Sequence, residues 1–420
     1  MMGKKIFSFI FLDIFAIFIF SACMPTVKHI VTNDNAYVIN LDEVKLDHDF
    51  KLSNVFDSIL IMPLDNSQVI IGKLNKVDIY EDRLIVLDAE YAKGIFVYNK
   101  KGDLLYKIGN VGFGPGEYAS CTDFAIDHLL DVIYVYDNMG RCILVYDIKT
   151  GEYQRTMKIE QNNMFNRIWC NGGNLYAVTT YFQPKKDKKE PYYILKQLDA
   201  TTGKVIEEWL DVETFNKGWK SEFLTTNLFY RLDEKQDLFA YGIADTIFCF
   251  NEKEFTPYMI FVGNKTIKCA DISEEEKDIS LNATERARMF MNVQRRLGLQ
   301  QKKIVNISNI YENDGYMYFN YVTWPRFMVK YNMENGESSV YTNIKDDLLF
   351  LSYPLKYTIT SFLTSDDNGV YYQVDTEMLS SLKSCLHDDV LSDKIKNKNV
   401  LNGITEDFNP IILYYEYKKK

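Results

Sequence analysis

The sequence predicts an all-β fold: a six-bladed β-propeller closed by an N-terminal strand and carrying two short helical inserts. A unit of four short apolar runs separated by turn residues is typical of a propeller blade. Several of these runs are apolar on both faces, as expected for strands buried between two neighbouring blades. The unit recurs six times, near 76–109, 123–159, 166–210, 224–261, 307–344 and 357–419.

The first 23 residues have the features of an export signal rather than of a folded segment. Lys4 and Lys5 precede an apolar run from Ile6 to Phe20, and small residues then lead to Cys23. This order resembles a bacterial lipoprotein signal, in which the cysteine is lipidated and becomes the mature N-terminus. The alternative is an uncleaved anchor or a plain secretion signal, although the apolar run is short for a membrane span. Either reading exports the rest of the chain.

Residues 24–50 are expected to form a tether and lead-in, and residues 51–420 the propeller. An isolated blade cannot bury its apolar faces, so the stability of a propeller depends on closing the ring. The extended run Ser58–Leu64 precedes the first complete blade unit. We therefore expect it to become the fourth strand of the last blade and to join the two ends of the ring.

Two inserts interrupt the repeat, at about 271–303 and 375–407. In the first, Asn282–Glu285 has the pattern of a capping box, and the apolar residues that follow recur at helical spacing. In the second, Asp375 or Thr376 can cap another helix. Each insert either covers apolar surface on a face of the disc, or, in the case of the first with its four arginines, forms a lid over the central channel.

A glycine-rich stretch follows the first blade unit. Its residues are Gly112, Gly114, Pro115, Gly116, Glu117 and Tyr118. We interpret it as a structural turn between blades, with glycines supplying positive φ and the proline fixing one corner. Together with 52–64 and 71–77, this stretch resembles the six-bladed propeller lipoproteins of Bacteroides-type bacteria, which are related in pattern to NHL-repeat propellers. That family has no established catalytic residues to transfer to this chain.

Candidate binding residues are sparse. Asp88, Asp137 and Asp245 each follow a second-strand run and could form a carboxylate ring for Ca²⁺, or could accept hydrogen bonds from turn amides. Trp324 and Arg326 could stack a sugar or bind a carboxylate, or could belong to a packed loop. The four histidines are too scattered for a metal site, and no serine-hydrolase elbow or cofactor motif is present.

The sequence favours a lipid-anchored binding or scaffold module for an unknown glycan, peptide or partner protein. The net charge of −10 argues against nucleic acid as a ligand. The alternative is a metal-dependent propeller enzyme, similar to lyases or lactonases, with a carboxylate site in the central channel. No acidic cluster follows Cys23, so we expect an outer-membrane lipoprotein of the cell envelope that faces the periplasm, with the lipid as its membrane contact.

Overall fold

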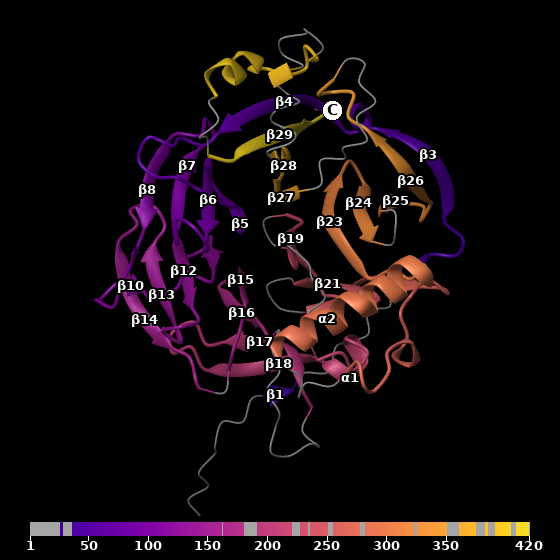
Figure 1. Ribbon diagram of the computed structural model, residues 1–420, viewed down its shortest axis with the longest axis horizontal. Coiled ribbons are helices and arrows are strands. Elements are labelled where there is room, and N and C mark those ends of the chain that lie inside the picture. The colour runs from indigo at the N-terminus through magenta and orange to yellow at the C-terminus, as the bar shows by residue number, and fades with distance from the viewer. Residues whose placement is uncertain are drawn as a thin grey trace, which may run out of the picture.

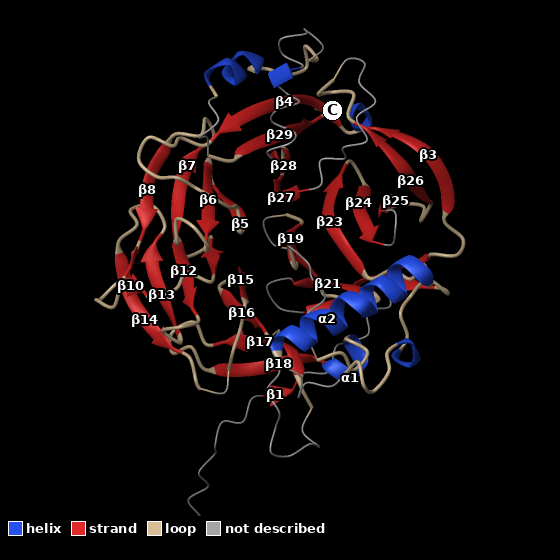
Figure 2. Ribbon diagram, viewed as in Figure 1, coloured by secondary structure: helices blue, strands red, loops and turns tan. Residues whose placement is uncertain are grey.

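The structure, a computed structural model, describes residues 26–27, 36–161, 163–179, 191–220, 227–233, 236–250, 255–277, 282–322, 326–350, 361–374, 383–384, 391–404 and 409–419. Within these residues, six sheets of four or five strands stand around a common axis (Figure 1). Strands dominate the molecule, and the helices lie at its periphery and across one face (Figure 2). The predicted six-bladed propeller is confirmed.

The first three blades follow one another along the chain, each with its first strand nearest the axis. Blade 1 is the sheet β5–β8, with strands Lys76–Tyr80, Arg83–Asp88, Gly94–Asn99 and Leu104–Ile108. Blade 2 is β11–β14, with strands Asp123–Asp127, Val132–Asp137, Cys142–Asp147 and Tyr153–Lys158. Blade 3 is β15–β18, with strands Arg167–Asn171, Asn174–Val178, Tyr193–Leu198 and Val205–Asp211.

The next two blades have the same order, and the sixth combines both ends of the chain. Blade 4 is β19–β22, with strands Phe229–Arg231, Asp237–Ala240, Thr246–Phe250 and Phe255–Val262. Blade 5 is β23–β26, with strands Asn306–Asn313, Tyr316–Val322, Arg326–Asn332 and Ser338–Lys345. Blade 6 contains β27, β28, β29 and β4, with strands Ser361–Asp366, Gly369–Val374, Ile411–Tyr417 and Phe56–Pro63.

The N-terminal closing strand is confirmed. Strand β4 pairs antiparallel with β29, with Ile59 opposite Tyr415 and Ile61 opposite Leu413. The Ser58 hydroxyl also donates a hydrogen bond to Glu416, a residue 358 positions later. The ring is therefore closed by a strand made at the beginning of the chain and paired at its end.

The segment expected as tether and lead-in contributes three further strands, which form a belt around the outside of the disc. These belt strands are β1 (Thr26–Val27), β2 (Tyr37–Asn40) and β3 (Lys45–Lys51), and they pair parallel with the outermost strands of blades 3, 4 and 5. Figure 1 shows β3 and β4 following the rim. In the part of the chain that is described, blades 1 and 2 have four strands each and no belt strand.

Apolar side chains fill the spaces between neighbouring blades. One cluster lies between blades 1 and 2, where Ile85 and Val97 meet Phe124 and Ile126. Separate clusters fill the spaces between blades 6 and 1, between blades 2 and 3, and between blades 3 and 4, and one large cluster joins blades 4, 5 and 6. This packing explains the runs that are apolar on both faces.

The blades divide the disc into two faces. We call the upper face the one that carries the loops from each fourth strand to the next blade and from second to third strands. The lower face carries the loops from first to second and from third to fourth strands. The upper face also holds α1 (Val212–Phe215), η2 (Cys269–Asp271), α2 (Ala283–Gln294) and the π-helix η3 (Arg295–Gln300), all between the fourth strand of one blade and the first strand of the next.

The first predicted insert is helical, and its apolar side covers apolar surface. Asn282 caps α2 and forms a capping box with Glu285. Phe290, Val293 and Leu297 then pack in one cluster with residues such as Trp219 and Ile243. About half of the second insert, 375–407, lies outside the described residues, including its expected cap at Asp375 or Thr376, and the described part contains η4 (Lys398–Gly403). A further short helix, η1 (Leu52–Asn54), precedes β4. None of the described helices is long and apolar enough to cross a membrane.

Candidate functional site

The innermost strands carry polar side chains toward the axis of the ring. In β5, Lys76 and Asp78 line the central channel, whereas Val77 and Ile79 pack between blades 6 and 1. This is the alternation expected of a strand, in which residues i and i+2 share a face. The innermost strands β11 and β15 follow the same pattern of polar and apolar positions, with polar residues Asp123, Asp127, Arg167 and Asn171.

Lys76 joins three blades at the channel. Its ammonium group lies 3.2 Å from the Asp123 carboxylate and donates hydrogen bonds to the carbonyls of Phe124, at 2.6 Å, and Ile168, at 3.3 Å. The ammonium also lies over the Trp169 ring, 5.3 Å from its centroid. Asp123 in turn accepts a hydrogen bond of 2.7 Å from the Ile168 amide. Lys76 of blade 1 is thus a largely buried cation with charged, polar and aromatic partners from blades 2 and 3.

A second network links blades 3 and 4. The buried Asp237 carboxylate accepts hydrogen bonds from the Trp169 indole, at 2.7 Å, and from the Asn171 amide, at 2.9 Å, and lies 3.7 Å from the Arg231 guanidinium. Trp169 stacks on Phe229 with their rings 5.2 Å apart. Burial raises the pKa of Asp237, and Arg231 and the two hydrogen-bond donors oppose that rise.

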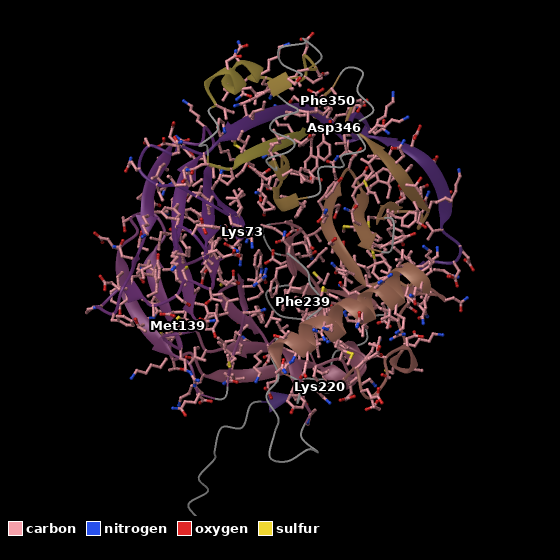
Figure 3. All side chains as sticks on the ribbon, in the orientation of Figure 1. Lys73, Met139, Lys220, Phe239, Asp346 and Phe350 are labelled. Carbon is pink, nitrogen blue, oxygen red and sulfur yellow. The ribbon has the colours of Figure 1, made fainter. Side chains whose placement is uncertain are left out.

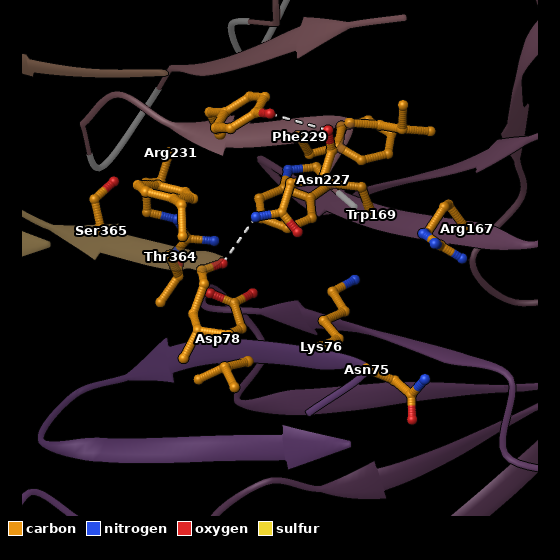
Figure 4. A pocket seen from close by; sticks show the side chains of 15 residues that line it. Asn75, Lys76, Asp78, Arg167, Trp169, Asn227, Phe229, Arg231, Thr364 and Ser365 are labelled. Atoms are coloured by element: carbon orange, nitrogen blue, oxygen red, sulfur yellow. Dashed lines mark hydrogen bonds between the residues drawn. The ribbon is translucent and has the colours of Figure 1, made fainter. Parts of the chain in front are cut away.

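A narrow pocket lies between these two networks (Figure 4). Its cavity volume is about 30 Å³, room for one or two water molecules, and its walls come from the innermost strands of blades 1, 3, 4 and 6. Asn227 donates a hydrogen bond of 2.9 Å to the Leu363 carbonyl across the axis. Asp78 is 4 % exposed, and its Oδ2 has no hydrogen-bond partner among the described residues. We call this pocket the channel waist.

The channel widens at the lower face into a cavity of about 280 Å³, which we call the vestibule. It shares Arg231 and Ser365 with the waist. Its walls are the ends of the innermost strands of blades 4, 5 and 6 and the turns that follow them, together with Tyr417. Five carboxylates and one guanidinium line it, a formal net charge of −4, and these residues are Asp233, Glu312, Asp314, Asp366, Asp367 and Arg231.

Two of the vestibule carboxylates, those of Asp366 and Glu312, have different surroundings. Asp366 accepts hydrogen bonds from Tyr371, at 2.7 Å, and Tyr414, at 3.0 Å, and pairs with Lys100 at 3.2 Å. Partial burial and the neighbouring charge of Asp233 raise the pKa of Glu312. Burial is the larger cause of this shift, and the Asp233 carboxylate adds to it.

Two of the aspartates proposed from the sequence as a carboxylate ring act within their own turns. Asp88 is fully buried and accepts hydrogen bonds of 2.7–3.3 Å from four backbone amides, those of Gly72, Lys73, Glu90 and Tyr91. Asp137, 2 % exposed, accepts three, at 2.6–3.1 Å, from Ala119, Ser120 and Gly140. Each carboxylate therefore ties the loop that enters its blade to the loop between the second and third strands.

The third aspartate, Asp245, has a different environment. It pairs with Lys217 at 2.9 Å. No group of three histidine, cysteine, aspartate or glutamate side chains close enough to hold a metal ion occurs among the residues that the structure describes. Trp324 and Cys23 lie outside those residues, and of Arg326 the structure describes only that it begins β25.

Removing the turn-bonded aspartates should affect stability. Asp88→Ala leaves four buried or half-buried amides without their acceptor, and we expect a loss of about 3 kcal/mol, because hydrogen bonds to charged groups contribute about 1.5–3 kcal/mol each and are not additive. Asp245→Ala removes one ion pair and should cost about 1 kcal/mol or less. Urea unfolding with and without EDTA checks both. A loss of stability on adding EDTA to the unaltered protein, absent from Asp88→Ala, would instead favour a metal at Asp88.

The glycine-rich stretch forms a compact loop between blades 1 and 2. Its ends pair as β9 (Asn110–Val111) and β10 (Glu117–Tyr118), and the side chain of Glu117 turns inward to accept a hydrogen bond of 2.8 Å from the Gly114 amide. Gly116 has a φ of 74°. Gly112 and Gly114 do not have the positive φ that was expected of them, and a Cβ on Gly112 would meet the flexible end of the Glu117 side chain. Pro115 lies between the last two of these glycines.

Tyr118 anchors this loop. Its ring is fully buried between blades 1 and 2, and its hydroxyl donates a hydrogen bond of 3.1 Å to the Ile108 carbonyl. Tyr146, from the third strand of blade 2, donates another of 3.0 Å to the Gly116 carbonyl.

The channel residues were missed by the sequence interpretation. We expected both faces of the inner strands to be apolar, yet charged or amide side chains interrupt the first run of several blades. Examples are Lys76-Val77-Asp78 and the two ends of Arg167-Ile168-Trp169-Cys170-Asn171. The vestibule residues have no comparable signal, because they lie at strand ends and in turns of three separate blades.

Two solved structures from Bacteroides are similar to this one in fold. A Bacteroides fragilis protein described as exported aligns with a TM-score of 0.67 and 17% sequence identity, over 91% of this chain and 100% of its own. A Bacteroides vulgatus protein of the DUF4221 family aligns with a TM-score of 0.50 and 12% identity, over 87% of this chain and 97% of its own. Among curated proteins, none matches the sequence.

A protein-family profile covers nearly all of the described propeller, including the belt strands β2 and β3. It is the profile described as "Domain of unknown function (DUF4934)", and it matches residues 36–416. The match begins one residue before β2 and ends within β29, so it spans all six blades and the closing strand. The chain therefore belongs to the DUF4934 family.

Proposed function

We propose that this protein is an exported binding module of the cell envelope whose vestibule takes a cationic segment of a peptide or partner protein. The observation that carries the proposal is the net charge of −4 in a cavity of about 280 Å³ at the end of the central channel. A concave site with one sign of charge concentrates field lines and raises the local concentration of the opposite charge. Lysine and arginine side chains supply that charge on a flexible stem.

Export is supported by the signal-like first 23 residues and by the fold shared with a Bacteroides protein described as exported. A lipid on Cys23 would hold the module at a membrane, and we place it in the outer membrane facing the periplasm, as a lipoprotein propeller of NHL-like pattern. Tyr417 is the aromatic residue of the vestibule wall, so the site offers a sugar little stacking surface compared with its charge. A basic peptide is therefore the better ligand class than a glycan.

The proposal is tested by fluorescence anisotropy with two labelled peptides of equal length, one rich in lysine and one rich in glutamate. The lysine peptide should bind, and its affinity should fall as salt rises, because exposed charge pairs are screened. Asp233→Asn/Glu312→Gln should weaken binding by about tenfold, since each partly exposed charge contributes about 0.5–1 kcal/mol.

A matched control variant makes the same change in net charge at carboxylates elsewhere on the lower face. Asp82→Asn/Glu152→Gln removes two exposed carboxylates from lower-face turns of blades 1 and 2, and neither residue lines the vestibule. This variant should bind the lysine peptide as the unaltered protein does. Equal binding of both peptides, or equal weakening by the two double variants, would contradict a vestibule site and leave only a general effect of net charge.

A further inference from the structure

Exposed apolar side chains gather on the upper face of blades 1 and 2. Four of the five most exposed large apolar residues of the described chain lie there: Ile70 (72 %), Tyr91 (69 %), Phe113 (96 %) and Met139 (73 %). They stand on four loops, two that enter blades 1 and 2 and two that join the second and third strands of these blades. We call this set the apolar rim. Figure 3 shows Met139 over these blades and Lys73 closer to the axis.

The loops that carry the apolar rim are held rigidly. The buried Asp88 carboxylate bonds to amides of both loops of blade 1, including that of Tyr91 itself, and Asp137 does the same in blade 2, next to Met139. Tyr91 packs so closely on Gly72 that a Cβ at Gly72 would overlap its ring. The exposure of these side chains is therefore built into the fold and does not come from a loosely held loop.

These loops carry no net charge, in contrast to the anionic vestibule. The segments 64–75, 89–93, 109–122 and 138–141 contain three cations, Lys73, Lys93 and Arg141, and three anions, Asp65, Glu90 and Glu117, for a net charge of zero in a chain of −10. All three anions have partners: Glu90 pairs with Lys73, Glu117 bonds to the Gly114 amide and Asp65 bonds to Ser67. An anionic surface would repel the vestibule but not this rim.

The N-terminal segment limits where the chain can meet a membrane. Cys23 precedes β1 by three positions, and an extended chain spans about 3.3–3.6 Å per residue, so a lipid there would lie within about 10 Å of β1. Strand β1 pairs with the outermost strand of blade 3, the neighbour of blade 2. The lipid anchor would thus lie at the outer edge of blade 3, next to blade 2, which carries part of the apolar rim. This step rests on the lipid anchor of the proposed function.

We propose that the apolar rim docks on the surface of a lipid bilayer, with Phe113 and Met139 inserted among the headgroups and Lys93 and Arg141 close to the phosphates. The fluid surface of a bilayer can accommodate single apolar side chains that stand on separate loop tips. Interfacial binding of this kind combines buried apolar area with attraction to anionic lipid. The docked orientation turns the upper face to the membrane and leaves the vestibule, on the lower face, open to the aqueous side.

The experiment uses the chain from residue 23 with Cys23→Ser, which keeps all described elements and lacks the lipid. Flotation is measured with vesicles of phosphatidylethanolamine alone and with added phosphatidylglycerol. The protein should float, and more strongly with phosphatidylglycerol. Phe113→Ser/Met139→Ser should reduce the partition coefficient by at least about tenfold, because each side chain gives up more than 1 kcal/mol of apolar burial. Both residues are largely exposed, so circular dichroism should be unchanged.

The control is Leu129→Ser/Leu130→Ser, which removes two side chains of 70 % and 62 % exposure from the lower face of blade 2. It should float as the unaltered protein does. Equal loss of flotation in both variants, or no flotation of the unaltered protein, overturns the proposal, and the second result would assign the rim to a protein partner. Binding of the lysine peptide should be unaffected by Phe113→Ser/Met139→Ser, so the two proposals fail independently.

Discussion

A chain that begins after Leu64 should lose cooperative unfolding, because it lacks the strand that closes the ring. Four side chains of β4 are at most 1 % exposed: Phe56, Ile59, Ile61 and Met62. Burying each contributes about 1.5–3 kcal/mol, so together they contribute about 6–12 kcal/mol. That is comparable with the whole stability of an ordinary domain, about 5–15 kcal/mol. Thermal unfolding followed by circular dichroism should show a broad, sloping change in place of a single sharp transition.

A second truncation separates closure from the belt. A chain that begins after Lys51 loses all three belt strands but keeps β4. It gives up the buried side chains of Ile39, Leu41 and Phe50, so its melting temperature should fall while its transition stays sharp. A single sharp transition in the chain that begins after Leu64 would show that five blades and an incomplete sixth fold without closure.

Lys76→Ala should be among the most destabilising single changes in the channel. The Lys76 side chain is 14 % exposed and that of Asp123 only 2 %, so the change leaves a buried carboxylate without its counter-charge. Breaking a buried pair on one side costs about 3–5 kcal/mol. Lys73→Ala, three residues earlier, breaks a pair with Glu90 whose side chains are about half exposed, and should lower the stability much less, because solvent screens exposed ion pairs. Urea unfolding measures both.

The double variant Lys76→Met/Asp123→Asn tests whether the unpaired Asp123 carboxylate causes the loss of stability in Lys76→Ala. It removes both charges, fills most of the lysine volume and keeps an acceptor for the Ile168 amide, so much of the lost stability should return. If the double variant is as unstable as Lys76→Ala, the loss comes from the missing contacts of the lysine with the Phe124 and Ile168 carbonyls and with the Trp169 ring. In that case the unpaired carboxylate is not its cause.

The blades could be predicted because each is a local pattern. Four runs with short turns between them are visible within about forty residues, and the closing strand is an extended run left over before the first unit. The belt could not be predicted in the same way. Tyr37–Asn40 reads as an extended run, but its parallel partner β22 begins more than 200 positions later, and parallel pairing has no connecting turn that a sequence would reveal.

Some residues of the site could likewise be predicted from the local sequence, and others could not. The polar positions of the inner strands are a local signal, concealed by the expectation that a strand between blades is apolar on both sides. Lys76 and Asp78 instead border the channel. The vestibule is not a local signal. Asp233, Glu312 and Asp367 lie at or just after the ends of the first strands of three different blades, and only the closed ring brings them to one cavity. Asp88 and Asp137 were noticed for their position, and the amides around them show why aspartate stands there.

The position of β4 in the chain also determines when the ring of blades can close. The strand at the beginning of the chain has its partner β29 near the end, so blade 6 remains incomplete until almost the last residue has been made or has crossed a membrane. Pairings between such distant segments form late, because the chain between them must first be brought together. If the chain is exported, as proposed above, its ring can close only after β29 as well as β4 has crossed the membrane.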